Sequence, residues 1–88
     1  MLLRFIGKQG AKDVFVTHHA EIRFKQRNLT YKEALIALEN RDVTYPKDED
    51  GKEKLRSTVG SKKKVFLTII EEKERVVIIT GGESDASA

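Results

Sequence analysis

Two dense runs of β-branched and aromatic residues near the end of the chain most constrain what it can fold into. They are KVFLTII (64–70) and RVVIIT (75–80), and the polar segment EEKE joins them. Both runs are apolar on both faces rather than on alternate residues. Strands with this pattern lie in the centre of a sheet and are covered at least in part on both sides. In a chain of 88 residues, these two strands must form the middle of one small core.

Two short helices are predicted in the first half of the chain. Thr17 can cap the first helix, because its hydroxyl can accept from a free backbone N–H of the first turn. Asn28 suits the left-handed conformation that commonly ends a helix. Thr30 and Glu33 form a capping box, and an apolar stripe at helical spacing follows them. We expect this second helix to end near Asn40.

The remaining segments predict strands. A β-like segment or small hairpin precedes the first helix, and a strand that Pro46 stops follows the second helix. Leu55, Ser57 and Val59 then alternate with polar residues. The order β-α-α-β-β-β, with a further N-terminal strand left open, predicts an α+β fold. We expect an antiparallel sheet of about four strands, with the two N-terminal helices packed on one face.

Composition limits the classes of function. The chain has no cysteine, which excludes disulfides and thiolate metal sites. Its first apolar run is broken by Arg4 and is too short for a signal peptide or a membrane span, so we expect a cytoplasmic protein without a membrane partner. We expect one domain over residues 1–82 and a flexible tail over residues 83–88. The usual phosphate-binding, dinucleotide-binding and zinc-protease motifs are missing, and we predict no cofactor.

The first helix carries the main candidate site. Its segment THHAEIRFKQRN (17–28) places His19, Arg23 and Arg27 within an arc of roughly 80°, beside the stripe that faces the core. Arginines four residues apart repel each other unless an anion lies between them. A guanidinium binds a phosphate or a carboxylate through two parallel hydrogen bonds. The three basic side chains beside the apolar stripe therefore predict an anion-binding edge on this helix.

Each of these residues also has an ordinary structural interpretation. The arginines can pair with nearby carboxylates, such as those of Glu21, Glu33 and Glu39. His19 can stay neutral and hydrogen-bond the start of its helix, although the ordinary imidazole pKa of about 6.5 suits proton transfer. Adjacent His18 lies about 100° around the helix, so the two histidines do not chelate a metal from one face. We therefore predict no metal site.

Basic residues on the predicted strands add a second set of candidates. Lys54 and Arg56 alternate with the apolar Leu55, so both project from the same face of one strand. Lys64 ends a run of three lysines beside a predicted hairpin turn. Such a run is usually only a solvated turn, but it also supplies a candidate substrate-binding cation.

The chain resembles a family of small bacterial and archaeal proteins, classed as a domain of unknown function, with the helix motif H-A-x-x-R-M-x-x-R-G-I-[ST]. The matching string is HAEIRFKQRNLT (19–30), with Phe24 in place of Met and Asn28 in place of Gly. The resemblance extends over residues 17–81 and includes the STVG segment (57–60). That family is similar to the RelE/ParE-type toxin superfamily, which includes BrnT-like proteins.

The resemblance implies a RelE-like fold and a toxin of a toxin–antitoxin system. Some such toxins cleave mRNA, often on the ribosome, and an antitoxin holds them inactive. The motif carries His19 and Arg23 as catalytic candidates and Arg27 as a binding candidate. Arg56 joins the catalytic set through the strand argument above. In metal-independent cleavage a 2′-hydroxyl attacks its own phosphate, and here His19 would carry the proton while the arginines clamp the phosphate.

Two alternatives stand beside this hypothesis. One is a non-catalytic module that binds a protein or a nucleic acid through the same basic edge, whereas in the toxin hypothesis Lys54 and Lys64 are substrate-binding residues beside Arg27. The other is a structural domain whose arginines only brace the helix against the sheet. The target RNA, the antitoxin and the oligomeric state are not set by the sequence.

Overall fold

The computed structural model describes residues 3–60 and 63–83. Its elements are β1 (Leu3–Gln9), β2 (Lys12–Thr17), α1 (His18–Gln26), α2 (Tyr31–Glu39), β3 (Arg41–Thr44), β4 (Glu53–Val59), β5 (Lys63–Glu71) and β6 (Arg75–Glu83). The strands form one sheet in the order β1-β2-β6-β5-β4-β3. Neighbouring strands are antiparallel except β2 and β6, which are parallel.

This topology corrects the predicted fold. The RelE-like prediction of an antiparallel sheet with about four strands in the order β-α-α-β-β-β is wrong, because the described residues form a mixed sheet of six strands. The N-terminal segment is a complete hairpin, and its second strand pairs with β6, so that Val14 lies opposite Val76 and Val16 opposite Ile78. A pairing between the two ends of the chain leaves no local periodic signal, so sequence patterns could not reveal it.

The helix boundaries were predicted correctly from their capping residues. The hydroxyl of Thr17 accepts from the N–H of Ala20 at 3.1 Å at the start of α1, and Asn28 has a left-handed φ of 56° just beyond its end. Both halves of the capping box between Thr30 and Glu33 form at the start of α2. No helix in the described part of the chain is long and apolar enough to cross a membrane.

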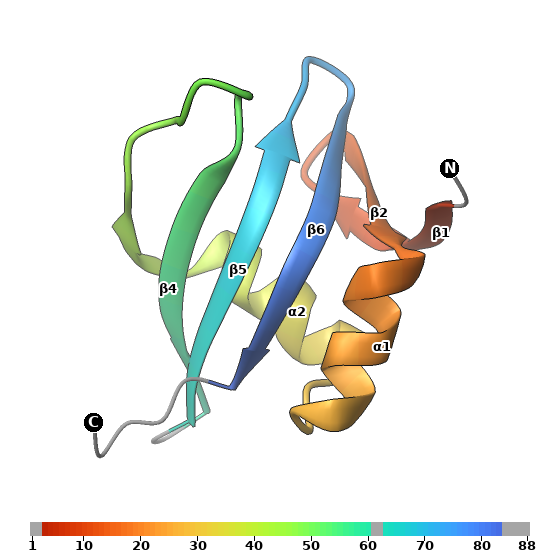
Figure 1. The fold of residues 1–88 in the computed structure, drawn as a ribbon, viewed down its shortest axis with the longest axis vertical. Coiled ribbons are helices and arrows are strands. Elements are labelled where there is room, and N and C mark those ends of the chain that lie inside the picture. Colours follow the sequence, from red (N-terminus) through yellow and green to blue (C-terminus); the bar gives the residue numbers. More distant parts are fainter. Residues whose placement is uncertain (1–2, 61–62, 84–88) are drawn as a thin grey trace.

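The two helices pack against one side of the sheet and bury the core there. Figure 1 shows α2 behind β4 and β5, while α1 lies beside β6. Ala34 and Ala37 of α2 are fully buried, and their small side chains let this helix approach the sheet closely. The largest fully buried side chains include Phe24, Leu38, Leu55, Leu67, Ile69 and Ile78. None of the described helices lies over the opposite face of β4, β5 and β6, which we call the open face.

The last strand is longer than predicted. β6 includes Gly81 and Gly82, and it also includes Glu83, which the sequence assigned to a flexible tail. The rest of that predicted tail, residues 84–88, lies outside the described residues. A Cβ on Gly81 would lie 2.5 Å from Leu67 Cδ2 and 2.9 Å from the carbonyl oxygen of Phe66. Glycine is therefore needed here so that β6 can pass close to the core of the sheet.

One carboxylate joins strands from both halves of the sheet. Glu71 Oε2 lies 2.9 Å from Lys12 Nζ, and Glu71 Oε1 lies 3.5 Å from a guanidinium nitrogen of Arg41. Arg41 Nε also donates to the carbonyl of Leu38 near the end of α2. The hydrogen bond from Lys12, helped by the charge of Arg41, holds the pKa of Glu71 below its usual range.

This lowered pKa predicts a loss of stability in acid. The Glu71 contribution is fully present above the unfolded-state pKa of about 4.3, and it is lost as the pH falls through the lower folded-state pKa. We expect the urea midpoint of the wild type to fall in that window. Glu71→Gln should be less stable at neutral pH and should lose less on acidification.

The matched control is Glu74→Gln, because Glu74 is exposed and its side chain makes no ion pair among the described residues. This control should follow the wild-type curve. A Glu71→Gln variant with the same acid dependence as the wild type would contradict the proposed ion-pair contribution.

Candidate functional site

Side chains on the open face are arranged in rows that cross the strands. Arg56 of β4 lies opposite Phe66 of β5, and Phe66 lies opposite Gly82 of β6. Residues opposite each other on neighbouring strands project from the same face of a sheet. The adjacent row on this face consists of Lys54, Thr68 and Thr80. A row of cationic and aromatic side chains therefore lies beside a more polar row.

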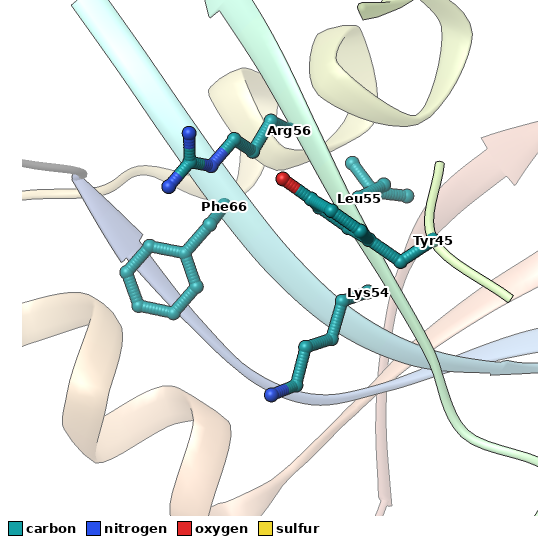
Figure 2. Close-up of a pocket in the computed structure, with 5 residues that line it drawn as sticks. All are labelled: Tyr45, Lys54, Leu55, Arg56 and Phe66. Atoms are coloured by element: carbon teal, nitrogen blue, oxygen red, sulfur yellow. The ribbon is translucent and has the colours of Figure 1, made fainter. Parts of the chain in front are cut away.

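A hollow of about 420 Å³ opens on this face around β4, and we call it the β4 hollow. In the view of Figure 2, Tyr45 and Phe66 lie on opposite sides of the hollow, with Arg56 and Lys54 toward its two ends. Tyr45 is 41% exposed. Leu55 completes the lining. The hollow combines apolar surface with two side chains that can only donate hydrogen bonds.

Arg27, at the end of α1, reaches the open face across a glycine. Its Cζ atom lies 5.4 Å from the centroid of the Phe66 ring, within the range of a cation–π interaction. A Cβ on Gly82 would lie 2.9 Å from the Cβ of Arg27 and would also meet its Cδ and Cγ atoms. The glycine therefore leaves room for the apolar stem of Arg27, while the aromatic ring holds its guanidinium.

The basic side chains of the predicted site are not neutralised by carboxylates. Glu21 pairs instead with Arg4 at 3.0 Å, and Glu33 pairs with Lys63 at 2.9 Å. Over the described ranges, no ion pair within 4.0 Å involves Arg23, Arg27, Lys54, Arg56 or Lys64. The carboxylate pairing of the structural interpretation therefore does not form.

Lys64 lies on the same face, one row beyond Arg56. Its register partner is Thr58, and Lys64 Nζ donates to the Thr58 hydroxyl at 2.8 Å. That hydroxyl donates in turn to Asp42 Oδ2 at 2.7 Å. The ammonium of Lys64 is therefore held near Asp42, and Lys64 does not line the β4 hollow.

His19 and Arg23 also lie outside the lining of the β4 hollow. His19 is exposed in the first turn of α1, and Arg23 Nη1 lies 3.5 Å from Gln26 Oε1 of its own helix. His19 precedes Arg27 along the helix axis by about 12 Å at roughly 1.5 Å per residue. The structure therefore gathers Arg27, Lys54 and Arg56 on the open face and leaves His19 and Arg23 farther along the helix.

Sequence reasoning missed the two aromatic residues of this site. The sequence places Phe66 only in a central strand and Tyr45 only in the strand that Pro46 stops. One signal for Tyr45 was present, because Pro46 follows it and disfavours a helical conformation at the residue before a proline. Tyr45 accordingly lies just beyond the end of β3, with its backbone N–H donating to the carbonyl of Lys54 at 2.8 Å. No group of three or more potential metal ligands is found among the residues that the structure describes.

Comparison of the chain with protein-family models found no match, and neither a curated protein nor a solved structure matches it. Its function therefore has to be inferred from the open face and the side chains that lie on it.

The position of Arg27 across Gly82 predicts a coupled effect on stability. Gly82→Ala should destabilise the wild type by about 1 kcal/mol or more, because the new methyl group displaces the Arg27 stem. In an Arg27→Ala background the same substitution should cost less, with a coupling of at least roughly 0.5 kcal/mol. Urea unfolding of the two single variants and the double variant measures this coupling.

Gly81→Ala provides the control, because its methyl group would meet Leu67 and backbone rather than Arg27. Its cost should be the same with and without Arg27. Additive effects of Gly82→Ala and Arg27→Ala would show that the arginine stem does not occupy this position.

Proposed function

We propose that this chain is a toxin-type domain that binds single-stranded RNA on its open face and cleaves the bound strand without a metal ion. One observation carries the binding part of the proposal. Lys54 and Arg56 line one hollow, Arg27 comes from a distant part of the sequence to lie against Phe66 of the same lining, and none of the three has a carboxylate partner among the described residues. Clustered cations of one sign repel each other, and a polyanion relieves that repulsion.

The chemistry of the hollow favours a single-stranded nucleic acid over other anions. Proteins that bind single strands combine a basic track for the phosphates with aromatic side chains on which unpaired bases stack. Tyr45 and Phe66 supply such rings between the cations. Bases held inside a duplex are already stacked on each other and do not reach rings of this kind.

The cleavage part of the proposal rests on the helix motif and its resemblance to toxins that act on mRNA. In this reaction a 2′-hydroxyl attacks the adjacent phosphorus, and the bond to the 5′-oxygen of the next nucleotide breaks. His19 accepts the 2′-hydroxyl proton and returns it to the departing oxygen, leaving a cyclic phosphate and a 5′-hydroxyl. Arg23 stabilises the negative charge of the phosphorane, while Arg27 and Arg56 hold neighbouring phosphates.

The same proposal sets the cellular context. The target is an mRNA, free or on the ribosome, so the protein acts in the cytoplasm. An antitoxin protein covers the open face when the toxin is inactive.

A non-catalytic RNA-binding module is the second candidate. The position of His19 favours it, because the proposed proton carrier lies along α1 and does not line the β4 hollow. In that case the open face binds RNA and leaves it intact.

Binding through these cations predicts a measurable salt dependence. The logarithm of the affinity for a single-stranded RNA should fall linearly with the logarithm of the salt concentration, with a slope of about −0.7 per phosphate contact. Arg27→Gln, Lys54→Gln and Arg56→Gln should each weaken binding and make the slope shallower by about 0.7. Fluorescence anisotropy with a labelled oligonucleotide measures both quantities.

Lys32→Gln is the charge-matched control, because Lys32 is exposed on α2, on the other side of the sheet. It should leave the slope unchanged. An effect of Lys32→Gln equal to that of Arg56→Gln would mean that only net charge matters and would count against a site on the open face.

Cleavage predicts a second set of results. Purified protein should cut single-stranded RNA in the presence of a metal chelator, and expression should arrest growth. His19→Ala should remove cleavage and growth arrest by at least about a hundredfold while binding is retained. A DNA oligonucleotide of the same sequence should bind and stay intact, because it lacks the 2′-hydroxyl. Salt-sensitive binding without cleavage of any RNA, and with normal growth, would establish the second candidate.

A further inference from the structure

We propose that the β4 hollow is a pocket for one unpaired nucleobase and that it favours guanine over adenine. This inference rests on the proposed RNA binding and specifies which part of the nucleotide the hollow takes. It depends on the lining of the hollow, on the different exposure of its two aromatic rings, and on the hydrogen-bonding groups at its ends.

Size and lining suit a nucleobase with part of its ribose. The hollow measures about 420 Å³, and small-molecule sites in proteins measure roughly 300–1,000 Å³. Such sites are mainly apolar and contain a few polar groups that fix the orientation of the ligand. The rings of Tyr45 and Phe66 give this hollow its apolar surface, and Lys54 and Arg56 give it charged hydrogen-bond donors.

Tyr45 is the ring that can receive a base. The Phe66 ring already carries the Arg27 guanidinium at 5.4 Å, and Phe66 is partly buried. Tyr45 is the more exposed of the two residues, at 41%. Its backbone is held on one side by the hydrogen bond to Lys54 and on the other by Pro46, which restricts the conformation of the residue before it. A base therefore meets an aromatic surface that is already in place.

The two aromatic residues contact different parts of the nucleotide in this proposal. Arg27, held over Phe66, is directed to the phosphate backbone, and Tyr45 stacks the base. The two sites lie on opposite sides of the same hollow in Figure 2, with Arg56 near the upper end of both rings in that view. A single nucleotide can then contact Arg56 through its phosphate while its base extends along Tyr45 toward Lys54.

The preference for guanine follows from the donors at the hollow. Lys54, toward which the base extends, carries only hydrogen-bond donors, and so does Arg56, which contacts the phosphate. Guanine presents two neighbouring acceptors, O6 and N7, on one edge. Adenine presents a donor amino group beside N7, so a lysine or arginine that faces this edge loses one partner and meets a competing donor. The lysine donors that face the base therefore favour guanine over adenine.

The test uses the full chain and labelled single-stranded RNAs that differ at one position. In a strand of uridines, the central nucleotide is guanosine, adenosine or an abasic ribose, and affinity is measured by fluorescence anisotropy. We expect the guanosine strand to bind the tightest. Removing the base should weaken binding between about fivefold and 150-fold, which is the effect of losing one base–aromatic stack. Adenosine should fall between the other two.

Substitutions of the lining residues test whether the base preference arises in the hollow. Tyr45→Ala should reduce the difference between the guanosine and abasic strands to nearly nothing, while Tyr45→Phe should keep it. Lys54→Met should reduce the guanosine-to-adenosine ratio more than it reduces the advantage of either base over the abasic strand. Phe5→Ala is the matched control, because Phe5 is an exposed aromatic residue of β1 outside the hollow, and it should preserve all three affinities.

The outcomes separate this inference from the proposed function. Equal, salt-sensitive binding of the three strands by the wild type would overturn the base pocket and leave RNA binding through the cations in place. A higher affinity for the adenosine strand than for the guanosine strand would overturn the guanine preference. Failure of the wild type to bind any of the strands would overturn both proposals. Because the oligonucleotide series needs only the wild-type protein, a variant that does not fold does not affect these conclusions.

Discussion

The parallel pairing of β2 with the first half of β6 is the constraint on which the rest of the structure depends. It joins Asp13–Val16 to Arg75–Ile78 and thereby ties the beginning of the chain to its end. Beyond Ile78 the β2 edge of β6 is no longer paired with β2, because β2 ends at Thr17 and α1 begins. α1 packs beside this second half of β6, where Arg27 extends over Gly82 onto the open face. The pairing therefore decides where the basic edge of the helix points.

The unequal cover of the two faces follows from the same arrangement. The helices bury one face of the sheet through Phe24, Leu38 and their neighbours. On the other face, side chains of the strands pack against each other. Beyond β6 the same side of the sheet continues onto β2 and β1 and is apolar there, because Phe5 and Phe15 stack edge to face at 5.7 Å and Phe15 lies opposite Val77. The other end carries the cations. A face that is neither fully apolar nor uniformly charged, with a hollow between exposed rings, is suited to a ligand that has both flat apolar surfaces and negative charge.

The parts of the structure that could be predicted from sequence are those set by interactions within a few residues. Thr17, Thr30 and Glu33 satisfy backbone groups of their own helices, so these residues predict where each helix begins. The alternation around Leu55 placed Lys54 and Arg56 together on one face of β4, and both line the hollow. The number of strands, the parallel pair and the place of Glu83 in β6 could not be predicted, because they depend on partners far away in the chain.

By itself, the sequence determined two capped helices, two central strands and a set of basic side chains at helical and strand spacing. Each of these features depends on local geometry, in which a side chain repeats every 3.6 residues on a helix or every second residue on a strand. Only the tertiary structure decided which of the basic residues meet, and it brought Arg27 to Phe66 and Arg56 while leaving His19 farther along the helix. It also placed Tyr45 at the hollow. Register and strand order depend on how much apolar surface the whole sheet buries, and a short segment of the chain does not determine that total.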